Sequence, residues 1–170
     1  MCFPELVPLW SWETLAFSNR TGNVSFFQGD GWEKAAMVQG KGGEMTKRVE
    51  MTSVDDWRHR LGQRQQRKRQ WLALRQAGSG GSVGTGRMLF SPVDINIDIL
   101  KIDVEGYDAQ VLQGAKKTLQ QHVKVVVFEV SNCGHWAETL LSEVVESMAV
   151  HDLVCYMTMA DHLSLTSVCD

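Results

Sequence analysis

The chain has 170 residues, of which 44% are hydrophobic and 22% charged, a composition typical of a globular protein with one core. Its net charge of −3 gives no whole-protein field that would attract nucleic acid, and no apolar run reaches the length of a membrane span. The four cysteines form no CxxC pair, which favours a reducing, cytoplasmic environment.

The first regular patterns are short strands. Residues 14–18 and 23–28 flank a polar turn that ends at Gly22, and residues 29–47 form a loop with five glycines. Residues 49–54 alternate apolar and polar side chains, as a half-exposed strand does. Asp55 and Asp56 then predict the cap of a helix that begins near Trp57.

That helix has an unusual charge distribution. Seven of the chain's 17 basic residues lie in it with no acid among them: Arg58, Arg60, Arg64, Arg67, Lys68, Arg69 and Arg75. One interpretation is a patch for nucleic acid or another acidic partner, and the other is a solvated surface helix inside an insertion over residues 58–90. The Gly/Ser run at 78–86 lacks the spacing of phosphate-binding loops and is predicted to be a flexible linker.

The most informative segment is 98–106, Asp-Ile-Leu-Lys-Ile-Asp-Val-Glu-Gly. Residues 99–104 are predicted to form a buried strand, with Asp103 and Glu105 at its end and Gly106 breaking it. Ligands of open α/β sheets bind at the carboxyl ends of the strands, so these acids are candidate site residues. The alternative is that Asp103 caps the next helix and Glu105 is solvated.

Helix and strand patterns alternate after this segment. Helices are predicted over residues 107–121 and 135–149, and strands over residues 123–130 and 153–159. The run at 123–130 is β-branched, which is typical of a strand buried on both faces. This order predicts parallel βαβ units with residues 99–104 and 123–130 as adjacent, parallel strands.

Several segments resemble the FkbM-type methyltransferases in the family's order. Residues 101–106, with Val-Leu at 111–112 and Gly-Ala at 114–115, are similar to the family's hallmark, and residues 16–22, 52–56 and 126–130 are similar to its other strands. The resemblance implies a Rossmann-like class I sheet of mostly parallel strands with flanking helices. It also implies S-adenosylmethionine as cofactor and methylation of a hydroxyl oxygen on a small molecule or glycan.

The resemblance also assigns residues to the site. Asp103 is expected near the methionine end of the cofactor and Glu105 near the acceptor, where two close carboxylates would raise one pKa and suit a base. The expected cofactor-binding residues are Ala16, Ser18, Asn19 and Asp103. The expected acceptor-binding residues are Glu129, Asn132, His135 and Trp136, although His and Trp at helix starts also serve in packing and capping.

The resemblance is incomplete at the front of the chain. The family's glycine-rich cofactor loop and its ribose-binding acid have no counterpart before Ala16. We therefore expect residues 1–170 to be one partial, N-terminally truncated methyltransferase domain that binds its cofactor weakly. Two other classes remain open. One is a non-catalytic α/β module that binds an acidic partner through residues 58–75, and the other is a metal-dependent hydrolase, although no ligand spacing is diagnostic of a metal site.

Overall fold

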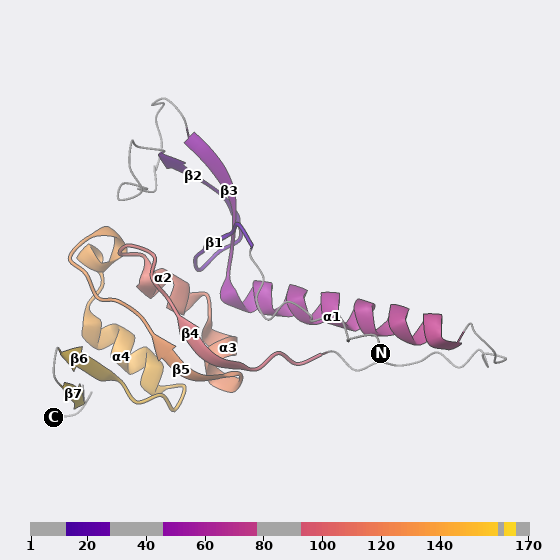
Figure 1. Cartoon of the computed structure of the whole chain (residues 1–170). Coiled ribbons are helices and arrows are strands. Elements are labelled where there is room, and N and C mark those ends of the chain that lie inside the picture. The colour runs from indigo at the N-terminus through magenta and orange to yellow at the C-terminus, as the bar shows by residue number, and fades with distance from the viewer. Residues whose placement is uncertain (1–12, 28–45, 78–92, 160–161, 166–170) are drawn as a thin grey trace.

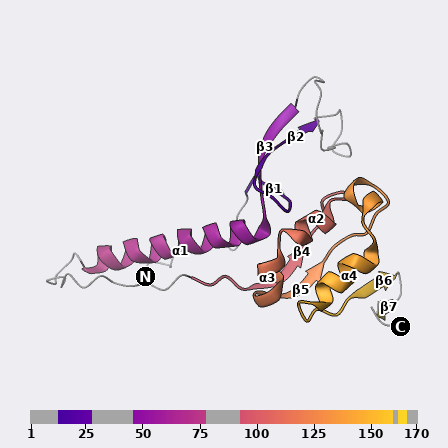
Figure 2. The same ribbon diagram turned by 180° about the vertical axis from the view of Figure 1, so that it is seen from behind.

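The computed structural model describes residues 13–27, 46–77, 93–159 and 162–165. In chain order these residues form a three-stranded sheet, a long helix, a small parallel α/β unit and a two-stranded hairpin (Figure 1). The helix projects away from the α/β unit, and the view from behind shows the same arrangement (Figure 2).

The first sheet contains the three strands predicted for the front of the chain. They are β1 (Ala16–Phe17), β2 (Gly22–Phe27) and β3 (Thr46–Thr52), in the order β1-β3-β2. β1 runs parallel to β3 and β2 runs antiparallel to it. The two strands that flank the turn at Gly22 therefore both pair with β3 rather than with each other.

Helix α1 (Val54–Ala77) begins three residues before the predicted start. Ser53 is its cap, because the Ser53 hydroxyl accepts a hydrogen bond of 3.0 Å from the backbone N–H of Asp56. Asp55 and Asp56 lie in the first turn, so the prediction that they form the cap was wrong. Val54 is buried in the core, whereas most side chains beyond Gly62 are exposed.

The α/β unit contains the predicted parallel pair. β4 (Ile97–Lys101) and β5 (Val123–Val127) are parallel, with Ile99 opposite Val125. The predicted helix between them is divided into α2 (Asp108–Gln113) and α3 (Lys116–Gln121). Gly114 lies at this division and packs closely against the end of β1, because a Cβ there would clash with the backbone oxygen of Ser18.

The second predicted helix is also divided. A 3₁₀ turn, η2 (Gly134–Glu138), precedes α4 (Leu141–Ala149). The strand predicted at 153–159 is present as β6 (Tyr156–Met159), and it pairs antiparallel with β7 (His162–Leu165) in a sheet of its own. It therefore does not extend the parallel pair of β4 and β5.

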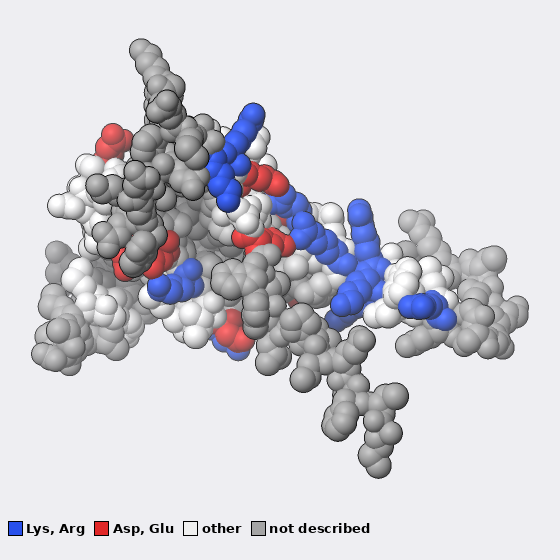
Figure 3. Space-filling view, turned by 45° about the horizontal axis from the view of Figure 1, so that its top comes forward, with Lys and Arg blue, Asp and Glu red and all other residues white. Residues whose placement is uncertain are grey.

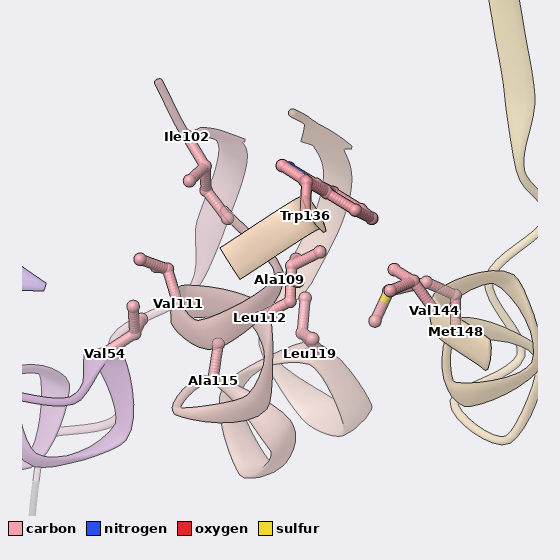
Figure 4. Close-up of a cluster of buried hydrophobic side chains, with 10 residues drawn as sticks. All are labelled: Val54, Ile102, Ala109, Val111, Leu112, Ala115, Leu119, Trp136, Val144 and Met148. Atoms are coloured by element: carbon pink, nitrogen blue, oxygen red, sulfur yellow. The ribbon is translucent and has the colours of Figure 1, made fainter. Parts of the chain in front are cut away.

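The main core lies where α2, α3, η2 and α4 meet the strands (Figure 4). Ala109, Leu112 and Leu119 are at most 2% exposed and face Val144 and Met148 of α4. Burial of a leucine, valine or methionine side chain contributes roughly 1.5–3 kcal/mol. Helical periodicity of the apolar residues therefore gave the correct core faces for α2, α3 and α4.

The prediction that residues 123–130 are buried on both faces was wrong for the described structure. Leu100 and Val126 pack against the core cluster, but Ile99 is 66% exposed, Val125 49% and Val127 46%. Successive side chains of a strand point to opposite faces, so one face of the β4–β5 pair is covered and the other is open among the described residues.

The described part of the chain is therefore a mixed α/β structure with a small parallel sheet and flanking helices. Its strands form three separate sheets, two of which contain antiparallel pairs. The Rossmann-like class and the single-domain assignment with an insertion at 58–90 stay predictions. No helix in the described ranges is long and apolar enough to cross a membrane.

Candidate functional site

The candidate site is the loop that leaves the carboxyl end of β4. Ile102 is buried and anchors the loop in the core, while Asp103 and Glu105 are exposed. Glu105 has a φ of 50° and Gly106 a φ of 94°, so both lie in the left-handed region. A glutamate rarely adopts this conformation, and residues held in such conformations cluster at functional sites.

A second loop, which follows β5, holds this turn in place. The carbonyl oxygen of Gly106 accepts hydrogen bonds from the backbone N–H groups of His135, at 2.9 Å, and Trp136, at 3.2 Å. A Cβ at Gly106 would lie 2.6 Å from the carbonyl oxygen of Cys133. Only glycine fits here, and the close approach of the two loops fixes the position of Glu105.

Asp103 is paired with a cation from its own strand. The ammonium of Lys101 lies 2.8 Å from a carboxylate oxygen of Asp103, and both side chains are largely exposed. The hydrogen bond and charge of Asp103 raise the pKa of Lys101, and the charge of Glu129 adds to this effect. The carboxyl ends of β4 and β5 therefore bring Lys101, Asp103 and Glu129 together.

Three of the four expected cofactor-binding residues lie in β1 or just after it, namely Ala16, Ser18 and Asn19. Ser18 is buried, and its hydroxyl donates to the side-chain oxygen of Gln110 at 3.3 Å. The amide of Asn19 donates to the side-chain oxygen of Gln113 at 3.0 Å. Ala16 pairs with Met51 in the first sheet. The polar side chains of Ser18 and Asn19 thus bind α2.

The expected acceptor-binding residues differ in exposure. Glu129 and Asn132 are exposed and His135 is half-buried. Trp136 is 5% exposed and stacks on Phe128, with ring centroids 6.2 Å apart, so it packs in the core. Glu129, Asn132 and His135 are therefore the members of this set that a ligand at the strand ends could contact directly.

Comparison with known families identifies the segment that carries this geometry. Residues 93–153 match the methyltransferase FkbM domain. This match confirms the resemblance noted for the segment around Asp103. No curated protein and no solved structure matched the chain.

The FkbM segment, residues 93–153, begins just before β4 and ends after α4. It contains Asp103, Glu105 and all four expected acceptor-binding residues. It covers about a third of the chain and leaves out β1, β2, β3 and α1. Ala16, Ser18 and Asn19 lie outside the matched range, so their cofactor-binding role stays a prediction.

Sequence reasoning missed two aspartates that hold the FkbM segment together. Asp108 is fully buried, and its Oδ1 accepts a hydrogen bond of 3.3 Å from the backbone N–H of Glu129. Its Oδ2 has no hydrogen-bond partner within the described ranges. Asp55 accepts three hydrogen bonds from Lys117 and Thr118 at the start of α3. An acid at a helix start was the available signal, but it does not reveal a partner distant in the sequence.

The described cavities lie away from the candidate site. One, of about 250 Å³, lies between the first sheet and α1 and is lined by Glu13, Glu50, Trp57 and Arg60 among others. The other, of about 210 Å³, lies between α2 and α4. Asp103 and Glu105 line neither of them. No group of three or more metal-ligating His, Cys, Asp or Glu side chains occurs within the described residues.

Proposed function

We propose that this chain is an S-adenosylmethionine-dependent methyltransferase that acts on a hydroxyl oxygen, with Asp103 and Glu105 as its catalytic carboxylates. One observation carries the proposal: the FkbM match covers a strand end where two exposed acids are held by a glycine turn. Acids at this end of a parallel sheet occupy the usual position of ligand-binding residues in α/β proteins.

The described residues fit one part of S-adenosylmethionine and not the whole of it. The exposed carboxylates of Asp103 and Glu105 can attract the positive charge of its sulfonium and ammonium groups. The polar side chains of Ser18 and Asn19 bind Gln110 and Gln113, and the glycine turn at Gly106 is filled by Cys133. The described residues therefore do not enclose the cofactor.

The acceptor side of the proposal rests on the chain's own groups. A carboxylate within hydrogen-bond reach of a hydroxyl can orient it and remove its proton, which makes the oxygen a better nucleophile. Glu105 suits this role because the turn fixes its backbone and Lys101 pairs with Asp103 rather than with Glu105. Glu129, Asn132 and His135 then supply hydrogen-bonding groups at the neighbouring strand end.

We expect the affinity for S-adenosylmethionine to be low. Each missing charge-assisted hydrogen bond forfeits about 1.5–3 kcal/mol, so two or three missing bonds weaken binding by a hundredfold or more relative to an enclosed site. The test is a titration of the full chain with S-adenosylmethionine, followed by calorimetry and by ligand-observed NMR, which detects weak binding.

A matched control separates the site from general charge effects. Asp98 lies at the opposite end of β4, is exposed, and pairs with Lys124 at 2.6 Å, as Asp103 pairs with Lys101. We expect Asp103→Asn to weaken binding and Asp98→Asn to leave it unchanged. No binding at all, or equal binding by Asp103→Asn and the unmodified chain, would overturn the proposal. Micromolar binding that Asp103→Asn abolishes would support the function and refute the low affinity.

A further inference from the structure

The outer half of α1 is a basic surface that has no acidic partner among the described residues. In the N-terminal half of α1, Arg58 pairs with Asp94 at 2.9 Å, Arg60 with Glu50 at 2.6 Å and Arg64 with Glu13 at 2.6 Å. Beyond them, no carboxylate of the described residues lies within ion-pair distance of the next three basic side chains, Arg67, Lys68 and Arg69. Figure 3 shows Lys and Arg side chains gathered along this projecting helix.

Most basic residues in the outer half of α1 share their side of the helix with an aromatic ring. At 3.6 residues per turn, Arg64, Lys68, Trp71 and Arg75 form one row along α1. The opposite side carries Gln63, Gln66, Gln70 and Ala73, together with Arg69. Trp71 is 55% exposed, and the guanidinium of Arg75 lies 4.9 Å from the centre of its ring.

The local charge is opposite to that of the whole chain. Residues 57–93 contain eight basic residues and no Asp or Glu. Because the whole chain has a net charge of −3, the remaining residues carry −11. A partner that meets α1 therefore experiences a positive field, and at physiological salt a surface charge acts over a distance of only about 8 Å. The net charge of the chain is thus a poor guide to what the end of this helix attracts.

The residue types favour a nucleic-acid strand over a membrane or an acidic protein. Membrane-surface helices need a continuous apolar face, but Trp71, Leu72 and Leu74 all lie within about one turn, and Lys68 and Arg75 interrupt the side that they share. Arginine, which forms planar bidentate hydrogen bonds with phosphate, outnumbers lysine on this surface. An exposed Trp beside Arg and Lys supplies the stacking platform and the phosphate contacts that single strands use.

We propose that residues 64–75 of α1 bind single-stranded nucleic acid. Arg67, Lys68, Arg69 and Arg75 contact phosphates, and Trp71 stacks on a base. This interaction does not depend on the proposed methyltransferase function. Helix α1 lies outside the FkbM segment, which contains Asp103 and Glu105.

The test uses the full chain and a fluorescein-labelled oligodeoxythymidine of about 20 nucleotides, with binding followed by anisotropy at several salt concentrations. Four phosphate contacts to a single strand predict a slope of log K against log salt of about −2.8. In the triple variant R67Q/K68Q/R69Q the slope should fall to about −0.7, with one contact left. Trp71→Ala should weaken binding about tenfold, because it removes a stacking platform.

The control variant is R20Q/K47Q/R48Q, which removes three exposed basic residues from the first sheet. It changes the net charge by the same amount and should leave binding unchanged. Glutamine keeps a high helix propensity, and circular dichroism checks that α1 is intact. Absence of binding at low salt, equal losses in the control and the helix variant, or no effect of Trp71→Ala would overturn the proposal. So would preferential binding to duplex, to phosphatidylserine vesicles or to polyglutamate.

Discussion

Replacement of Asp55 by alanine should disconnect α1 from α3. One carboxylate oxygen of Asp55 accepts hydrogen bonds from the backbone N–H and the hydroxyl of Thr118, at 2.8 and 2.6 Å, and the other accepts from the N–H of Lys117 at 3.1 Å. In addition, the N–H of Asp55 donates to the carbonyl of Gly114 at 3.1 Å. These bonds cap a short helix whose own N-cap residue, Ala115, provides no side-chain hydrogen bond.

The expected cost follows from which donors lose their partners. Thr118 is fully buried, so its N–H and hydroxyl would remain unsatisfied at about 1–3 kcal/mol each, whereas Lys117 is exposed and water can replace its bond. Asp55→Ala should therefore lower the free energy of unfolding by about 3 kcal/mol and the melting temperature by roughly 6–12 °C. Asp55→Asn keeps one acceptor oxygen and should cost about half as much.

Urea denaturation followed by circular dichroism measures the change, and Thr118→Val completes a double-mutant cycle with Asp55→Ala. The two substitutions should be strongly non-additive because they remove the same hydrogen bond. A loss of less than about 0.5 kcal/mol in Asp55→Ala, or simple additivity of the pair, would refute the capping role.

Two further predictions concern close packing and pH. Gly114→Ala and Gly62→Ala should each destabilise the fold by about 1–3 kcal/mol in thermal denaturation, because the new Cβ would lie 2.1 Å from the Ser18 oxygen and 2.6 Å from the Val93 oxygen. Gly22→Ala, whose Cβ meets only Met51 at 3.8 Å, is the control, and equal stability of all three would contradict the steric argument. A hydrogen bond from Thr21 and a weaker one from Ser53 lower the pKa of Asp56 below 3.8. The ionised Asp56 therefore stabilises the fold above pH 3.8, and this contribution is lost as the pH falls through the lowered pKa. The stability difference between the unmodified chain and Asp56→Asn should therefore be largest near neutral pH and vanish in acid, and a difference that does not change with pH would exclude this linkage.

Regular patterns in the sequence were sufficient to predict the α/β unit. The β-branched run gave β5, the apolar residues before Asp103 gave β4, and parallel pairing followed from the helix between them. The errors had two kinds of cause, contacts distant in the sequence and equal local propensities. Gly114, where the predicted helix divides, packs against Ser18, and no periodicity within residues 107–121 records that neighbour. The cap of α1 was misassigned because Ser and Asp are equally good N-caps, so propensity could not choose Ser53 over Asp55.

The candidate site was predictable in position but not in detail. A strand followed by two acids and a glycine placed Asp103 and Glu105 at the carboxyl end of β4. The left-handed backbone of Glu105 depends on the second loop, which crowds Gly106 through Cys133. Likewise, the burial of Trp136 depends on stacking against Phe128, so its residue type alone did not separate a core residue from a ligand contact.

The open face of the β4–β5 pair carries apolar residues where a strand with one face in water usually has polar ones. A strand with one face in water normally alternates apolar and polar residues. The open face of this pair instead carries the apolar residues Ile99, Val125 and Val127. Leaving apolar area exposed costs about 25 cal/mol per Å² relative to burying it, so the exposure of these side chains does not stabilise the fold. On that face, Lys101 opposite Val127 at the carboxyl end is the polar exception among the paired residues. The one charged residue of the paired positions on this face therefore lies at its carboxyl end, which is the end where the proposed site lies.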